Sequence, residues 1–133
     1  MRVAVIGAAG MIGRRLVARL AGDGVIGTER VSRLLLVDVA PVEAVDAGEI
    51  EVQTIAADIA QPGAPHEILA GLPDVIFDLA AVVSGEAEAE FEKGYRVNVD
   101  ANRLLLEAVR ARYRLPAAGR VQLVDCSVRA AVS

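Results

Sequence analysis

Three glycines stand at regular spacing near the start of the sequence, at Gly7, Gly10 and Gly13 in the stretch GAAGMIG. A branched apolar run precedes them and a segment with helical spacing follows. Glycine frees a turn from Cβ strain, lets an anion approach the backbone and lets a helix pack closely on a strand. The N–H groups and dipole at a helix start attract negative charge. The spacing therefore indicates a cradle for a phosphate or pyrophosphate group.

Asp38 is the second candidate, because it ends the next predicted strand about 25 positions beyond Gly13, close to the place of the acid in dinucleotide-binding motifs. A carboxylate there accepts hydrogen bonds from the adenosine ribose and repels a 2′-phosphate. No arginine follows it closely. These features favour NAD over NADP. A glycine-rich turn without a ligand is the alternative.

Other polar residues are ambiguous. Asp58, after the third predicted strand, could reach adenine or cap the next turn. The small residues of DLAAVVSG would let a cofactor approach the backbone, or would simply pack. Asn98, near a helix start, is typical of a cap, and the lone histidine, His66, is expected to be solvated or to cap a helix. The acidic stretch 86–92 is expected to be a solvated helix face, so we predict no metal site.

The elements that must position these residues alternate between short β-branched runs and longer segments of helical period, which predicts helices around a parallel sheet. Runs such as LLLV and DVIFDL lack polar alternation, as strands covered on both faces do. We expect an α/β, Rossmann-type parallel sheet of about five strands in the order 3-2-1-4-5. The predicted strands are Arg2–Ile6, Arg33–Asp38, Ile50–Ile55, Asp74–Leu79 and Val121–Cys126.

Three helices are predicted between these strands, at Met11–Leu20, Pro65–Ala70 and Val97–Ala111. Apolar spacing assigns a buried face to the first and the last of them. In the first helix that face is expected to hold Ile12, Leu16 and Leu20. In the last it is expected to hold Val97, Ala101, Leu105, Ala108 and Val109.

Composition narrows the class of protein. A chain of 133 residues fits one domain with one core. The hydrophobic fraction of 54% and mean hydropathy of +0.44 are high, so some apolar surface is expected to stay uncovered. The apolar runs are far shorter than the roughly 20 residues of a membrane span, and the N-terminus does not look like an export signal. These features favour a cytoplasmic protein.

Net charge and cysteine content exclude further kinds of partner and site. A net charge of −4 with a pI near 5.0 gives no basic footprint for nucleic acid or anionic lipid. The single cysteine, Cys126, excludes an internal disulfide and a multi-cysteine zinc site. We expect Cys126 to be a small buried residue in a strand.

Five motifs follow one another along the chain: Gly7-x-x-Gly10-x-x-Gly13, Asp38, Asp58-Ile59, Leu79-Ala80-Ala81, and Asn98 in YRVNVDANRLLLEA. Together they resemble the extended short-chain dehydrogenase/reductase family, which holds NAD-dependent sugar epimerases and dehydratases. The stretch from Asp78 to Ala108 is similar to the D-erythronate dehydrogenase branch. That branch oxidises a 2-hydroxy sugar acid with NAD to its 2-keto acid.

The resemblance implies a cofactor role for each motif. The backbone of Met11 and Ile12 would hold the pyrophosphate, and Asp38 would hold the ribose. The other contacts would be Asp58 and Ile59 around adenine, Leu79, Ala80, Ala81 and Val83 along the nicotinamide half, and Asn98 in the network beneath it.

Catalysis in this family uses a Ser or Thr after the fifth strand and a Tyr-x-x-x-Lys pair, in which the Tyr acts as acid and base and the Lys lowers its pKa. Ser127 falls at the position of that Ser and is the one catalytic candidate. Neither Tyr95 nor Tyr113 is followed four positions later by the single lysine, Lys93. The catalytic Tyr and Lys are therefore missing from these residues.

The resemblance covers nearly the whole chain but only the N-terminal half of family members. Residues 1–133 are thus expected to form a partial NAD-binding Rossmann domain without the substrate-binding half. Three positions depart from the family pattern: Asp78, where His is frequent, and Ala101 and Asn102, where Gly-Thr is frequent. Without the added strands of longer members, the fifth predicted strand would be an exposed edge.

Three functions stay open at this point. The first is the NAD-binding portion of an erythronate-dehydrogenase-like enzyme, or of a sugar-nucleotide epimerase or dehydratase, inactive by itself. The second is a non-catalytic NAD-binding sensor or interaction module that forms a homodimer over the edge strand. In the third, a complementing chain supplies the Tyr and Lys.

Overall fold

A five-stranded parallel sheet forms the centre of the molecule in the computed structural model, which describes residues 1–43, 45–80, 99–114 and 120–125. From one end of the sheet to the other, the strands are β5 (Glu51–Ala56), β4 (Arg33–Asp38), β1 (Arg2–Ile6), β6 (Val75–Asp78) and β7 (Gln122–Asp125). Counted along the chain, this is the predicted order 3-2-1-4-5, so the Rossmann-type fold is confirmed. β7 lies at the end of the sheet, as expected for the fifth predicted strand.

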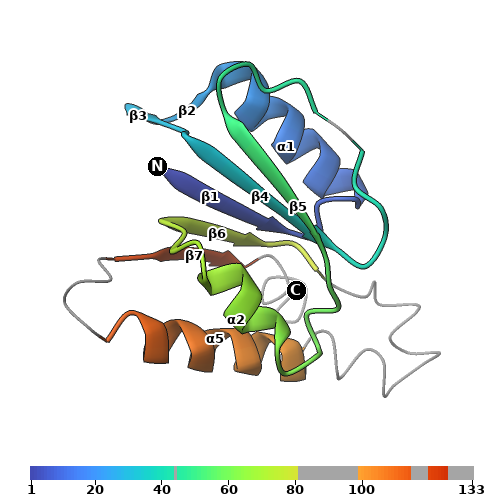
Figure 1. Ribbon diagram of the computed structural model, residues 1–133, viewed down its shortest axis with the longest axis vertical. Coiled ribbons are helices and arrows are strands. Elements are labelled where there is room, and N and C mark those ends of the chain that lie inside the picture. Colours follow the sequence, from blue (N-terminus) through green and yellow to red (C-terminus); the bar gives the residue numbers. More distant parts are fainter. Residues whose placement is uncertain (44, 81–98, 115–119, 126–133) are drawn as a thin grey trace, which may run out of the picture.

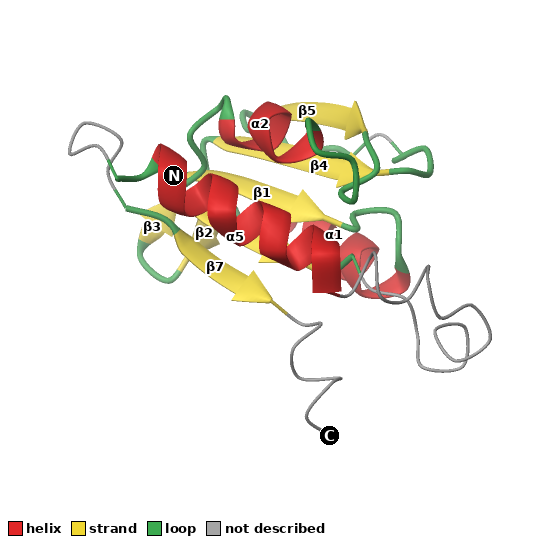
Figure 2. Cartoon of the chain, turned by 90° about the horizontal axis from the view of Figure 1, so that it is seen from below, coloured by secondary structure: helices red, strands yellow, loops and turns green. Residues whose placement is uncertain are grey.

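Helices cover both faces of the sheet, with α1 (Met11–Asp23) on one face and α2 (Ala64–Leu69) and α5 (Ala101–Arg112) on the other (Figure 1). Figure 2 shows α2 and α5 next to each other in front of the sheet. The handedness of parallel crossovers explains this division. The chain moves from β1 to β4 toward one edge of the sheet, and from β5 to β6 and then to β7 toward the opposite edge. Because each crossover is right-handed, the connecting helices then lie on opposite faces.

The core has two parts, one on each face of the sheet. Alternate residues of each strand enter the two parts: Val3 and Val5 pack on the α1 side, and Ala4 and Ile6 pack on the side of α2 and α5. Both sets are at most 1% exposed. Burying a Val or Ile side chain stabilises a fold by about 1.5–3 kcal/mol. Strands that contribute in this way on both faces must be apolar throughout, which explains runs such as LLLV.

The buried face of α1 differs from the prediction. The structure buries Gly13, Val17 and Leu20, whereas Ile12 is 61% exposed. The face predicted from Ile12, Leu16 and Leu20 is therefore wrong at Ile12. The reason is that Gly13 presses against the preceding loop, so the buried face starts there and continues at helical spacing through Val17 and Leu20.

α1 also continues past its predicted end at Leu20 and stops at Gly24, which has φ +69 and donates its N–H to the carbonyl of Leu20 at 2.9 Å. This is the usual left-handed glycine after a helix. A short hairpin follows, formed by β2 (Val25–Ile26) and β3 (Glu29–Arg30). We did not predict this hairpin, although Gly27 at its turn was a signal for it.

The packing of α5 agrees with the prediction over the described residues. Ala101 and Leu105 are fully buried, and Ala108 and Val109 pack against the same core. Residues 97 and 98 of the predicted helix lie outside the described residues. His66 is exposed on α2, as expected. Within the described ranges, no helix has the length and apolar character that crossing a bilayer requires.

Candidate functional site

The loop from Gly7 to Gly13 joins β1 to α1 at the carboxyl edge of the sheet. Gly7 has φ +83, and a Cβ there would lie 2.8 Å from the carbonyl carbon of Leu79. A Cβ on Gly13 would lie 2.1 Å from the carbonyl oxygen of Gly7. Hydrogen bonds from the N–H groups of Gly7 and Ala8 to the carbonyl of Val37 hold the loop on β4, at 2.8 and 3.2 Å. Both glycines are thus required by close backbone contacts within the protein.

Gly10 differs from the other two glycines. Among the described residues, a Cβ at this position would have the carbonyl oxygen of Gly7 at 3.4 Å as its one close neighbour. Gly10 is the N-cap residue of α1, with φ −71 and ψ 170 and no capping side chain. The described residues therefore leave the space in front of Gly10 open toward the start of the helix.

The first turn of α1 presents its N–H groups to that open space. The first intrahelical bond runs from Arg14 to the carbonyl of Gly10 at 2.9 Å, so the N–H groups of Met11, Ile12 and Gly13 have no partner within the helix. The turn carries no acidic residue, and the Met11 and Ile12 side chains are 72% and 61% exposed. A helix start of this kind favours an anion. The cradle therefore fits the pyrophosphate of a dinucleotide.

Asp38 lies beside this cradle at the end of β4. Its Oδ2 accepts the N–H of Ala9, within the glycine loop, at 2.9 Å. Its Oδ1 accepts the N–H of Ala40 at 3.1 Å. Each carboxylate oxygen can accept more than one hydrogen bond. Asp38 is therefore held in place against the loop and keeps the capacity to bind ribose hydroxyls.

Val39 follows Asp38 and is 69% exposed. It was not among our candidate residues. An apolar side chain directly after Asp38 was the signal in the sequence. Its exposure gives an apolar surface next to the carboxylate, of the kind on which a flat aromatic ring packs.

Asp58 caps the turn that follows β5, which is one of its two predicted roles. Its Oδ1 accepts the N–H of Ala60 at 2.9 Å, and its carbonyl accepts the N–H of Gln61 at 2.9 Å. The neighbouring Ile59 is 6% exposed and packs in the core with Ile68. Its side chain therefore points into the core, so a ligand would meet its backbone.

The end of β6 lies against the glycine loop. The N–H of Leu79 donates to the carbonyl of Ile6 at 2.9 Å, and the Leu79 backbone sits closest to Gly7. Asp78 is 3% exposed and its Oδ1 accepts the N–H of Ala80 at 3.2 Å. The structure thus brings Leu79 and Ala80 to the same edge as the glycine loop. The remaining predicted site residues, namely Ala81, Val83, Asn98 and Ser127, lie outside the described residues.

Comparison with known proteins agrees with this site. Residues 3–128 match the model of the NAD dependent epimerase/dehydratase family. Over 114 residues the chain is 37% identical to D-erythronate dehydrogenase of Cupriavidus necator, which covers 83% of this chain and 35% of that protein. It is 31% identical over 110 residues to D-erythronate dehydrogenase of Haemophilus influenzae, covering 83% of this chain and 34% of that protein.

A solved structure is similar over most of the chain. The nucleoside-diphosphate-sugar epimerase from Agrobacterium tumefaciens is 43% identical, with a TM-score of 0.87, over 94% of this chain and 36% of that one. The chain spans about a third of the length of the curated relatives that it matches. A family match over nearly all its residues, together with the glycine cradle and Asp38, shows that the chain belongs to the NAD dependent epimerase/dehydratase family, whose cofactor is NAD.

Proposed function

We propose that the chain binds NAD at the carboxyl edge of its sheet. One observation carries this proposal: Gly7 and Gly13 are closed by backbone contacts, while among the described residues Gly10 opens onto N–H groups of α1 that have no partner within the helix, beside Asp38. This arrangement leaves room for an anion where the helix dipole attracts one. It also places an acceptor for ribose hydroxyls next to that anion.

Each part of the cofactor has a counterpart in the chain. The N–H groups of Met11 and Ile12 hold the pyrophosphate, and Asp38 binds the adenosine ribose. Adenine packs on Val39, close to the backbone of Asp58 and Ile59. The nicotinamide half lies along Leu79, Ala80, Ala81 and Val83, with Asn98 beneath it. When bound, NAD supplies a hydride acceptor.

We further propose that the family reaction of this protein is the NAD-dependent oxidation of a 2-hydroxy sugar acid such as D-erythronate. The likeness to two D-erythronate dehydrogenases supports this substrate class. Ser127 would contact the substrate hydroxyl. We expect no turnover from residues 1–133 by themselves, because Tyr-x-x-x-Lys does not occur in them.

A second candidate function is the epimerisation of a nucleoside-diphosphate sugar. The similar structure from Agrobacterium tumefaciens, at 43% identity, favours it. Both candidates use the same NAD site and differ in substrate. A non-catalytic NAD sensor would share the site as well, and it would bind neither type of substrate.

Titration calorimetry with NAD tests the cofactor site. The variant Asp38→Asn keeps the size of the side chain and loses its charge, so we expect NAD to bind about tenfold more weakly, as the loss of a charge-assisted hydrogen bond predicts. The preference for NAD over NADP should shrink, because the charge that repels a 2′-phosphate is gone.

Asp46→Asn is the matched control. Asp46 is exposed, and its Oδ1 also accepts a backbone N–H two residues on, from Gly48 at 3.3 Å. It lies in the connection between β4 and β5 rather than against the glycine loop, so this variant should bind NAD normally. Equal NAD affinity in both variants would contradict the role of Asp38.

The substrate class is tested on the natural gene product that contains these residues. D-erythronate should produce NADH, followed by its absorbance, and replacing Ser127 by Ala should slow that reaction. Interconversion of a nucleoside-diphosphate sugar without net NADH would instead support the epimerase. Binding of NAD with neither activity would support the sensor.

A further inference from the structure

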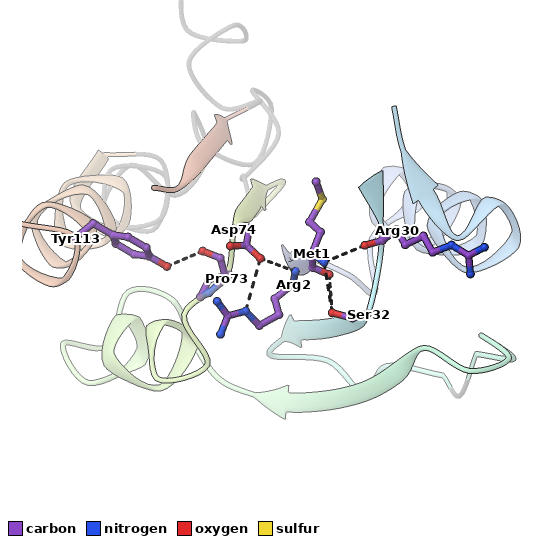
Figure 3. Close-up of polar contacts among 7 residues, drawn as sticks. All are labelled: Met1, Arg2, Arg30, Ser32, Pro73, Asp74 and Tyr113. Carbon is purple, nitrogen blue, oxygen red and sulfur yellow. Dashed lines mark hydrogen bonds and ion pairs between the residues drawn. The ribbon is translucent and has the colours of Figure 1, made fainter. Parts of the chain in front are cut away.

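Four charged residues form a row across the amino edge of the sheet, opposite to the glycine loop. In sheet order they are Glu51 on β5, Arg33 on β4, Arg2 on β1, and Asp74 directly before β6. Glu51 is the register partner of Arg33, and Arg33 is the register partner of Arg2. The N–H of Arg2 donates to Oδ2 of Asp74 at 2.7 Å (Figure 3). The row therefore has two central cations between two flanking acids.

Each central arginine pairs outward with its own acid. Nη2 of Arg33 donates to both carboxylate oxygens of Glu51 at 3.0 Å, and Nε of Arg2 lies 3.6 Å from Oδ2 of Asp74. These are the interactions of the two guanidinium groups within the described part of the chain. A guanidinium has five N–H donors, so both groups keep donors for a further acceptor. Adjacent like charges on neighbouring strands repel each other unless such an acceptor lies between them.

A cavity of about 260 Å³ opens next to these two arginines, between α2 and the sheet. Both arginines line it. Its apolar lining includes Leu35, Ile55 and Ile68. Strand periodicity explains the combination, because Arg33 and Leu35 are two positions apart and so face the same side of β4.

We propose that this cavity binds a small organic monocarboxylate. The carboxylate lies between the guanidinium groups of Arg2 and Arg33, a geometry that suits planar forked donors. The short apolar part of the ligand packs on Leu35 and Ile68. The volume is just below the usual range of about 300–1,000 Å³ for ligand sites, which limits the ligand to a few carbon atoms.

The acids around the cavity disfavour more than one negative charge on the ligand. Glu67 also lines the cavity, and Glu51 and Asp74 each neutralise part of one arginine. A doubly charged phosphate group would be repelled by these acids. The site is also separate from the dinucleotide cradle, because it lies at the other edge of the sheet.

NMR titration of the ¹⁵N-labelled chain tests the proposal with three probes: butyrate, the uncharged butyramide and inorganic phosphate. Butyrate should shift the Nε–H resonances of Arg2 and Arg33 and the amide of Gly71 in a saturable way. Butyramide should produce no saturable shift at these positions, and phosphate should bind more weakly than butyrate. Saturating NAD should leave the butyrate shifts unchanged.

Two variants remove the site by different means. Arg33→Gln removes one guanidinium and should weaken butyrate binding about tenfold, as the loss of a charge-assisted hydrogen bond predicts. Gly71→Leu keeps both arginines but adds a side chain to the cavity lining beside Arg33, because Gly71 lines the cavity and a Cβ there would lie 3.9 Å from Nη1 of Arg33. It should weaken butyrate binding at least as much. Arg30→Gln, on the exposed β3, is the control and should bind butyrate normally.

Four results would overturn the proposal. Absence of a saturable butyrate shift in the unmodified chain would do so, as would equal binding of butyramide. Tighter binding of phosphate than of butyrate would reject the carboxylate as the ligand class. Unchanged butyrate binding in folded Gly71→Leu would place the probe outside the cavity, even if Arg33→Gln failed to fold.

Discussion

At the carboxyl edge of the sheet, backbone groups hold the candidate site together, whereas at the amino edge side chains pair with one another. The glycine loop is fixed by the N–H groups of Gly7 and Ala8 on the carbonyl of Val37, and Asp38 accepts backbone N–H groups. At the amino edge, by contrast, Arg33 pairs with Glu51. The glycine loop requires that Gly7 and Gly13 carry no Cβ, whereas the ion pair at the amino edge requires both of its side chains.

This difference has consequences for how each edge tolerates change. An added Cβ at Gly13 cannot be accommodated by a shift of a side chain, because the atoms it would meet belong to the backbone. Protein interiors also have little free space. Ion pairs between partly exposed side chains contribute about 0–1 kcal/mol. One added methyl group at the carboxyl edge should therefore cost more stability than the loss of one polar contact at the amino edge.

Gly13→Ala should have the largest effect. The new Cβ would lie 2.1 Å from the carbonyl oxygen of Gly7, so we expect the free energy of unfolding to fall by about 3 kcal/mol or more. Gly22→Ala is the control, because no described residue lies within 4 Å of a Cβ placed at Gly22 and alanine favours a helix by up to about 1 kcal/mol. Urea unfolding measures both. If the two variants had similar free energies of unfolding, the close backbone contacts at Gly13 would not make the carboxyl edge sensitive to an added methyl group.

Gly10→Ala should separate binding from folding. Its backbone angles suit alanine, so the free energy of unfolding should change by about 1 kcal/mol or less. The methyl group would project into the space proposed for the pyrophosphate, and NAD should bind at least about tenfold more weakly. Urea unfolding and NAD calorimetry on the same sample test this. Normal NAD affinity would show that the pyrophosphate lies elsewhere.

Tyr113→Phe probes the amino edge and should have the smallest effect. The hydroxyl of Tyr113 donates to the carbonyl of Pro73 at 2.6 Å (Figure 3), so its loss should cost about 1 kcal/mol at neutral pH. Burial, and then the nearby charge of Asp74, raise the pKa of Tyr113 above its ordinary value.

The raised pKa of Tyr113 gives this variant a pH signature. The folded protein keeps the tyrosine proton to higher pH than the unfolded chain does, so stability is fully present below the unfolded pKa near 10 and is lost as pH rises through the folded pKa. The Phe variant lacks this loss. The stability gap between the two proteins should therefore narrow above about pH 10. A constant gap in urea unfolding from pH 8 to pH 11 would contradict this account.

Much of the fold follows from local patterns. The bounds of β1 and β4 were predicted to the residue, because continuous apolar runs bounded by charged residues or glycine are typical of buried parallel strands. The cradle and Asp38 were found for a similar reason, since they depend on spacing along a few consecutive residues. The hairpin of β2 and β3 was missed, because each of its strands is only two residues long and shows no period.

The sequence by itself determined the order of the elements, the glycine cradle, and the acid that ends the second strand of the main sheet, because residue type and spacing act locally there. Only the tertiary structure decided which face of α1 is buried, since the contact of Gly13 with the loop sets that face. It also decided that Ile59 points into the core. The row of Glu51, Arg33, Arg2 and Asp74 likewise appears only when strands far apart in the sequence are placed in register.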